Sequence, residues 1–147
     1  MTTAATDPRA LKAGATLLRV TLGAMYVSHA WFKITAFGIA GFAGWLDSLG
    51  LPGFMAGPVI ALELIGGILI LAGFYARYVS IALLPVLAVA TWVHLPNGLI
   101  FSNANGGWEY PVFLMVASVV HALVGDGALA LKSRPLPFAA LRPAAQA

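Results

Sequence analysis

The 147-residue sequence contains no cysteine and very little charge. Without cysteine, the chain can form no disulfide bond, no thiolate metal site and no cysteine nucleophile. Charged residues make up 9% of the chain, whereas a soluble domain has about 25%. So few charges cannot cover a soluble globule of this size, and the mean hydropathy is +0.91. The composition therefore predicts a single-domain integral membrane protein over residues 1–147, in contact with membrane lipid.

Several motifs of soluble enzymes and of nucleic-acid-binding proteins are also missing. The sequence has no Walker loop, no G-x-S-x-G and no histidine pair at H-x-x-x-H or H-E-x-x-H spacing. Its net charge of +3 comes from basic residues beside apolar runs, where lipid headgroups would lie, so no nucleic-acid partner is expected. A metal held by His29, His94 and a glutamate is chemically possible. Because local ligand spacing is absent, neither a metal nor a haem is expected.

Four apolar segments are long enough to cross a bilayer, which needs about 20 residues. They cover about residues 17–37, 58–74, 78–94 and 110–131, the last ending anywhere from Val124 onward. These segments predict an all-α, four-helix membrane bundle with loosely ordered tails at 1–12 and 133–147. Pro85 predicts a kink in the third helix, and the short connection at 75–77 predicts an antiparallel hairpin. The apolar, glycine-rich segment 38–57 is expected to lie on the outer surface or to re-enter the membrane.

The placement of basic residues predicts the orientation of this bundle. Seven of the eight Lys and Arg residues would lie on one side: Arg9, Lys12, Arg19, Arg77, Lys132, Arg134 and Arg142. By the positive-inside rule both termini are then cytoplasmic, with Arg19 anchored among the inner headgroups. The tryptophans fall toward the opposite side, as an aromatic belt would: Trp31, Trp45, Trp92 and Trp108.

Five ionisable residues are predicted at similar depth in the outer half of the bundle. Inserting an ionisable side chain at the centre of a transmembrane helix costs about 2.5–3.5 kcal/mol, so each such residue is expected to have a structural or functional role. His29 and Lys33 are four residues apart and share a face of the first helix. Glu63, His94 and Glu109 come from the other three helices. Lys33 is the expected partner of Glu63.

Each of these residues also has a structural explanation. A pair of Lys33 and Glu63 could only fix the register of two helices, and His29 could bond a backbone carbonyl. His94 could cap the end of its helix, and Glu109 could be favoured by the dipole at a helix N-terminus. Convergence of all five at one depth is the argument for function.

Two further ionisable residues are predicted at the inner end of the fourth helix, with structural roles. Ser118 lies one turn from His121 and could satisfy its imidazole. Asp126 is expected to pair with Arg77 or Lys132.

Motifs in all four helices resemble the DoxX family of small four-helix membrane proteins, over about residues 18–131. The first helix, LLRVTLGAMYVSHAWFK, is similar to a family pattern L-R-x-x-x-G…H-G-x-x-K, matched by Arg19, Gly23, His29 and Lys33. The segment LELIGGILILAGFYAR is similar to E-x-x-G-G-x-x-L-x-x-G-x-x-x-R, matched by Glu63, Gly66, Gly67, Gly73 and Arg77. His94 matches a closing histidine, and GGWEY matches a G-G-x-E element.

The sequence departs from the family at two places. Ala30 replaces the glycine that usually follows the first histidine, and GDGALALK replaces a closing G-P-G-x-x-S-L-D.

The resemblance implies a bacterial or archaeal inner-membrane protein linked to quinone redox chemistry, similar to small subunits of thiosulfate:quinone oxidoreductase. Such a chain would be a subunit that works with a protein partner, and a homo-oligomer is also possible. It would not be a complete enzyme alone. Two alternatives remain: a non-catalytic anchor or assembly subunit for a redox partner, and transport of a proton or small solute.

Under the quinone hypothesis, the outer residues acquire defined roles. His29 or His94 would hydrogen-bond a quinone oxygen, beside Trp31 and Trp92. Glu63 or Glu109 would exchange the accompanying proton. Lys33 would polarise the second oxygen or hold Glu63 charged.

Overall fold

The computed structural model describes residues 7–137, and every regular element in this range is helical. The α-helices are α1 (Pro8–Phe32), α2 (Gly38–Ser48), α3 (Ala56–Ala72), α4 (Ala76–Ala82), α5 (Leu84–His94) and α6 (Glu109–Val124). A π-helical turn, Lys33–Phe37, joins α1 to α2, and 3-10 turns occupy Gly53–Met55 and Leu95–Asn97. Across the described residues there is no strand, so the all-α prediction is confirmed.

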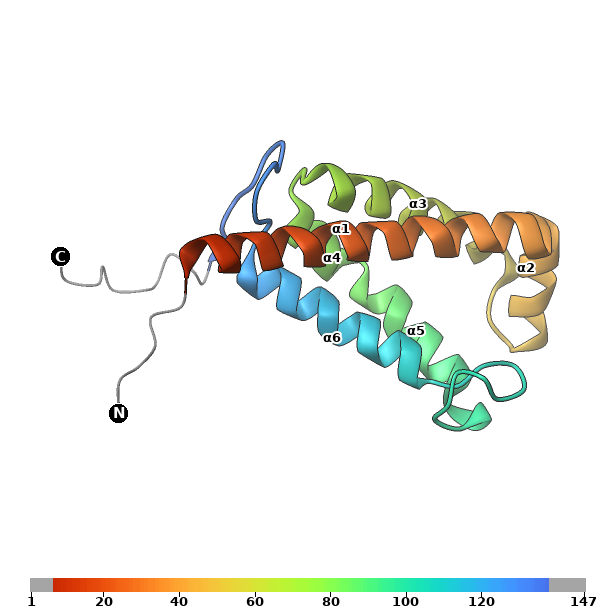
Figure 1. Ribbon diagram of the computed structural model, residues 1–147. Helices are drawn as coiled ribbons and strands as arrows, with labels where there is room; N and C mark the ends of the chain where they lie inside the picture. The colour runs from red at the N-terminus through yellow and green to blue at the C-terminus, as the bar shows by residue number, and fades with distance from the viewer. Residues whose placement is uncertain (1–6, 138–147) are drawn as a thin grey trace.

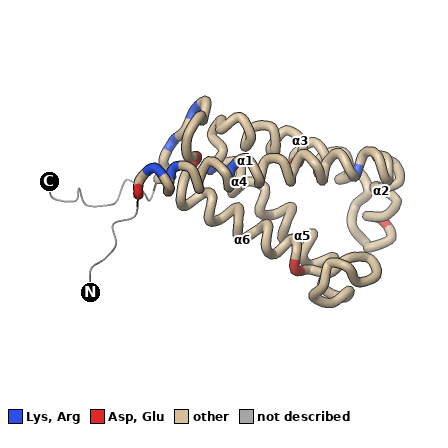
Figure 2. Tube along the Cα trace, in the orientation of Figure 1, with Lys and Arg blue, Asp and Glu red and all other residues tan. Residues whose placement is uncertain are grey.

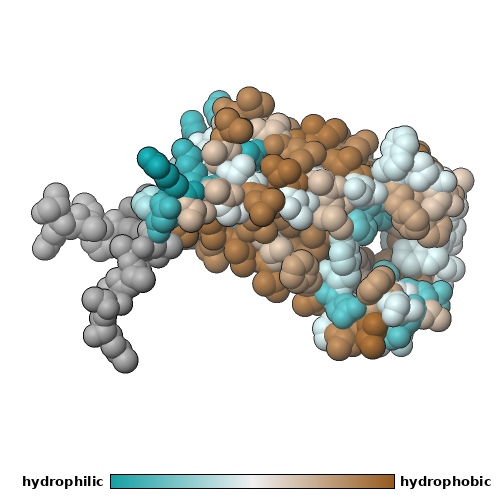
Figure 3. All heavy atoms as spheres, viewed as in Figure 1, coloured by the Kyte–Doolittle hydropathy of each residue, from teal (hydrophilic) through white to brown (hydrophobic). Residues whose placement is uncertain are grey.

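The helices form one elongated bundle with two different ends (Figure 1). The long helix α1 packs along α3, while α4 and α5 pack against α6. We call one end the loop end, because it holds α2 and the 98–108 loop. Figure 2 shows Lys and Arg gathered at the other end, which we call the basic end. The middle of the visible surface is largely hydrophobic, with hydrophilic residues toward the two ends (Figure 3).

Glycines bring the backbones of α1 and α3 into contact. A Cβ atom added at Gly67 would lie 2.9 Å from the carbonyl oxygen of Gly23, and one added at Gly23 would lie 2.8 Å from that of Gly67. Small residues let helix backbones approach each other this closely. This crossing sets the level at which side chains of the two helices meet.

The kink predicted from Pro85 is confirmed as a break between α4 and α5. Pro85 has no N–H to donate to the carbonyl of Ile81, and the α-helix is interrupted at Leu83. Before the break α4 packs against both α3 and α6, whereas beyond it α5 packs chiefly against α6. The predicted hairpin is also present, with Gly73 and Tyr75 in left-handed conformations between α3 and α4.

The first helix differs from its predicted bounds, whereas the last ends within its predicted range. Helix α1 begins at Pro8 and not near residue 17, because Asp7 accepts a hydrogen bond from the Arg9 N–H and Pro8 fills the first turn. Residues 8–12 are therefore helical, whereas the sequence analysis predicted a loosely ordered tail there. Helix α6 ends at Val124, the earliest end that the sequence analysis allowed, since Gly125 leaves the helix with φ 106°. The predictions for tails at 1–6 and 138–147 lie outside the described residues.

Two helical stretches are long and apolar enough to cross a membrane, by length and composition: Gly53–Ala72 and Ala76–Asn97. Helix α6 is apolar but shorter, with 16 residues. The segment predicted to be surface-lying or re-entrant contains α2, which lies beyond the end of α1 (Figure 1).

Candidate functional site

An ion pair between Lys33 and Glu63 joins the two most closely packed helices. Lys33 Nζ lies 2.5 Å from Glu63 Oε2, and the two side chains are 18% and 7% exposed. The pairing predicted from the sequence is therefore present. Because Lys33 follows α1 directly, its long side chain can reach back along the helix toward Glu63, near the middle of α3.

Helix α2 closes over this pair from the loop end. The ring of Phe42 lies 5.7 Å from Lys33 Nζ, a cation–π distance. Phe42 and Leu46 pack with Ala30, Ala56 and Ile60 in a small apolar cluster. The glycine-rich segment after the first helix therefore places an aromatic ring over the Lys33 ammonium group.

His29 forms a second polar contact one turn before Lys33. Its ring stacks on Tyr110 from α6, with 5.1 Å between ring centroids and 16° between planes. His29 Nδ1 lies 2.9 Å from the Met25 carbonyl oxygen. A neutral ring that donates there leaves Nε2 as an acceptor.

The hydroxyl of Tyr110 is buried, and it has no hydrogen-bond partner in the described part of the chain. Buried polar groups normally have a partner, so this donor is available to a ligand. No motif in the sequence pointed to Tyr110. Only its place beside His29, across two helices, identifies it.

His94 and Glu109 do not join the Lys33–Glu63 pair. His94 Nδ1 lies 2.8 Å from the Ala90 carbonyl oxygen, and Glu109 Oε1 accepts the Phe101 N–H at 2.8 Å. His94 therefore bonds within its own helix, and Glu109 holds the loop that precedes α6. Within residues 7–137, no hydrogen bond or ion pair connects them to Lys33 or Glu63, and no three metal-ligating residues gather.

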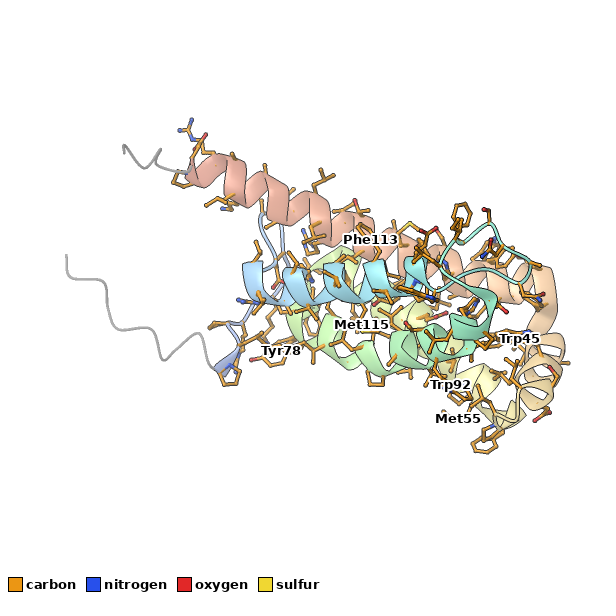
Figure 4. All side chains as sticks on the ribbon, turned by 90° about the horizontal axis from the view of Figure 1, so that it is seen from below. Trp45, Met55, Tyr78, Trp92, Phe113 and Met115 are labelled. Carbon is orange, nitrogen blue, oxygen red and sulfur yellow. The ribbon has the colours of Figure 1, made fainter. Side chains whose placement is uncertain are left out.

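The predicted tryptophans lie at the bundle surface. Trp31 is 63% exposed, and Trp92 is 57% exposed. Trp92 lines a cavity of about 290 Å³ with Leu49, Val93, Leu95 and Pro96. Figure 4 shows Trp45, Met55 and Trp92 at the same end of the molecule. This cavity lies beside the loop end and is not lined by Lys33 or Glu63.

The prediction that Arg19 is anchored among the inner headgroups was wrong. It is buried, and its guanidinium donates to the carbonyl oxygens of Leu71 (2.7 Å), Asp126 (2.8 Å) and Ala128 (2.7 Å). These carbonyls end α3 and form the turn after α6, where helix geometry leaves them unpaired. Arg77 does the same for α6, donating to Ala122 and Leu123.

The predicted partners of His121 and Asp126 were wrong. His121 Nδ1 is 2.8 Å from Ser80 Oγ, and its Nε2 is 3.3 Å from Asp126 Oδ1, without hydrogen-bond alignment. Ser118, expected to satisfy His121, instead bonds the Tyr26 hydroxyl at 2.9 Å. Sequence spacing favoured the near neighbour on the same helix, whereas packing brought in side chains from α4 and α1.

The carboxyl of Asp126 lies just beyond α6 and is buried. Burial raises the pKa of Asp126, but contacts with His121 and Ser133 and the charge of Arg77 outweigh it, so the pKa lies below its usual value. Asp126 is therefore an ionised group at the basic end, although burial opposes its charge.

Comparison with known proteins places the chain in a family. The DoxX family matches residues 14–95. A Bacillus subtilis (strain 168) protein named "Putative oxidoreductase CatD" is 32% identical over 123 residues, covering 84% of this chain and 87% of that protein. Escherichia coli (strain K12) "Inner membrane protein YqjF" is 37% identical over 123 residues, covering 80% and 88% respectively. No solved structure matches the chain.

The family match includes Arg19, Lys33 and Glu63, whose contacts hold α1 against α3 and against the turn after α6. Sequence motifs, helical architecture and whole-chain similarity agree, and the chain belongs to the DoxX family.

Proposed function

We propose that this chain is a multi-span inner-membrane subunit of a quinone-linked oxidoreductase complex. Its relatives include an inner membrane protein and a protein named as an oxidoreductase. The apolar middle of the bundle suits a bilayer, and the basic end suits the cytoplasmic side. The single observation that carries the site is Tyr110. Its ring stacks on His29, and its buried hydroxyl has no hydrogen-bond partner among the described residues.

The residues around Tyr110 fit a quinone headgroup. A quinone takes up two electrons and two protons reversibly, and its carbonyl oxygens accept hydrogen bonds. The Tyr110 hydroxyl could donate one such bond, and the aromatic faces of His29 and Tyr110 suit a flat ring. Lys33 follows α1 directly and lies about one turn beyond His29, roughly 6 Å along the axis.

The Lys33–Glu63 pair would manage the proton at this site. Glu63 accepts a proton as its carboxylate, and Lys33 compensates its charge when the proton leaves. The cluster around Phe42 excludes water from one side of the pair. Electron transfer would then belong to a partner subunit.

The test compares two tyrosines in the purified protein. Tyr110→Phe removes the unpartnered hydroxyl and should raise the Kd of a short-chain quinone by up to roughly tenfold, the value of one hydrogen bond. Tyr78→Phe is the matched control, because its hydroxyl donates to the Pro135 carbonyl oxygen away from His29. Binding is measured by quenching of tryptophan fluorescence in detergent. Equal Kd values for both variants and the parent protein would contradict the proposed site.

The anchor alternative has one observation in its favour. The Lys33–Glu63 pair satisfies its own charges and connects α1 to α3, which suffices for a register device. An anchor subunit would bind its redox partner equally well without these charges.

A further inference from the structure

Buried polar side chains continue from the Lys33–Glu63 pair toward the basic end. The Tyr26 hydroxyl bonds Ser118 Oγ, joining α1 to α6 at 2.9 Å. Farther along, Ser80, His121 and Asp126 form a second group with separations of 2.8 and 3.3 Å. All five side chains are buried; four lie in α1, α4 and α6, and Asp126 lies just beyond the end of α6. The quinone site requires none of them.

The glycine crossing places Tyr26 beside Glu63. Helices α1 and α3 are antiparallel neighbours, and their backbones meet at Gly23 and Gly67. One turn toward the loop end, α1 presents Tyr26 and α3 presents Glu63. Both residues are buried, and their backbone positions lie at the same level of the bundle, so one bridging water would link the hydroxyl to the carboxylate.

Helix α6 connects the two polar groups. Ser118 and His121 are three residues apart and lie on one face, about 4.5 Å apart along the axis. Ser80 bonds His121, so the proton must cross from Ser80 Oγ to Ser118 Oγ, and one bridging water would complete this step. At the far end, both carboxylate oxygens of Asp126 and His121 Nε2 are buried without a hydrogen-bond partner among the described residues.

We propose that Asp126, His121, Ser80, Ser118 and Tyr26 form a proton path from the basic end to Glu63. The path deepens the proposed function, because it supplies the proton that the Lys33–Glu63 site exchanges. Arg77 and Arg19 flank its entrance, but both guanidinium groups are held by backbone carbonyls, which leaves the Asp126 carboxylate to receive the proton.

The transfer balances without any electron carrier. Asp126 gains a proton and passes it to His121 Nε2, while His121 Nδ1 releases a proton to Ser80 Oγ. Each hydroxyl then accepts one proton and releases its own, so one O–H or N–H bond breaks as the next forms. The proton ends on Glu63 as a neutral carboxylic acid, and Lys33 keeps its positive charge.

The experiment reads protonation of Glu63 directly and needs no quinone. The full chain is reconstituted in liposomes in one orientation, and one side is acidified rapidly. Infrared spectroscopy follows the carboxylic-acid band of Glu63, which is identified by its absence from the Glu63→Gln variant. Acidification at the basic end should protonate Glu63 in the parent protein, and about 100-fold more slowly in Tyr26→Phe and Asp126→Asn.

Two controls separate a broken path from a damaged fold. Any protonation of Glu63 after acidification at the loop end should have the same rate in every variant, because no substituted residue lies on that side of Glu63. Tyr78→Phe should match the parent protein from both sides, since it loses a hydroxyl outside the path. Equal rates from the basic end in parent protein, Tyr26→Phe and Asp126→Asn would overturn the proposal. So would a Glu63 signal in the parent protein from the loop end alone. Loss of quinone binding would be a separate result, because no quinone is present.

Discussion

Charged side chains inside this bundle are stabilised in two different ways. Lys33 and Glu63 pair with each other, whereas the guanidinium groups of Arg19 and Arg77 donate to backbone carbonyl oxygens at helix ends. A carbonyl-bound arginine keeps a full positive charge and stabilises helix termini, so its role is structural. A paired carboxylate can be protonated and released, which makes Glu63 the better candidate for chemistry.

The stability of single and double variants tests the pair. Lys33→Met leaves Glu63 buried without its partner and should destabilise the fold by about 3–5 kcal/mol. Lys33→Met combined with Glu63→Leu should cost less than either single change, since no uncompensated charge remains. Thermal unfolding in detergent measures both. Additive losses in the double variant would show that the two side chains are not coupled.

The same double variant separates the two functional hypotheses. If it still assembles with its partner but no longer supports quinone-dependent turnover, Lys33 and Glu63 belong to a working site. If turnover also survives, the pair is a register device and the anchor alternative holds.

At the scale of helices, the contact between α1 and α3 holds the site together. Their approach depends on Gly23 and Gly67, which have no side chain to separate the backbones. Helix α2 adds the apolar cover around Phe42, and the break at Leu83 moves α5 away from α3. The site therefore depends on the close crossing of α1 and α3. It also depends on two interruptions of regular α-helix, at Lys33–Phe37 and at Leu83.

A pair of alanine substitutions tests this crossing. Gly67→Ala would place a Cβ 2.9 Å from the Gly23 carbonyl oxygen and should lower the free energy of unfolding by about 1–3 kcal/mol. Gly44→Ala in α2 is the matched control, because no atom lies within 4 Å of its added Cβ. It should be neutral or stabilising by up to about 1 kcal/mol. Equal effects at both glycines would refute the packing argument.

At the scale of the whole molecule, charge distribution predicts the orientation. Arg9, Lys12, Lys132 and Arg134 lie at the basic end with exposed side chains. Exposed basic residues near membrane-spanning helices favour the cytoplasmic side. The loop end, with Lys33 shielded by Phe42, would then face outward.

The absence of cysteine makes this orientation simple to test. Ser133→Cys marks the basic end and Ser102→Cys marks the loop end, and both serines are exposed. In intact cells, a membrane-impermeant maleimide should label Ser102→Cys and leave Ser133→Cys unlabelled. In inverted membrane vesicles the result should reverse. Labelling of both positions from the same side would contradict the proposed topology.

The sequence was sufficient for the features that depend on local order along the chain. Long apolar segments with little charge predicted the helices, Pro85 predicted the break in the third, and the short connection at 75–77 predicted the hairpin between α3 and α4. The Lys33–Glu63 pair also followed, because few other charges were available within the apolar segments.

The tertiary structure decided the contacts between residues distant in sequence. It separated His94 and Glu109 from the Lys33–Glu63 pair and placed Tyr110 beside His29. It also turned Arg19 inward and brought Ser80 to His121. The physical reason is that helical spacing fixes which side chains share a face, but not which face of the next helix they meet. That choice depends on close packing, here on the glycine crossing of α1 and α3.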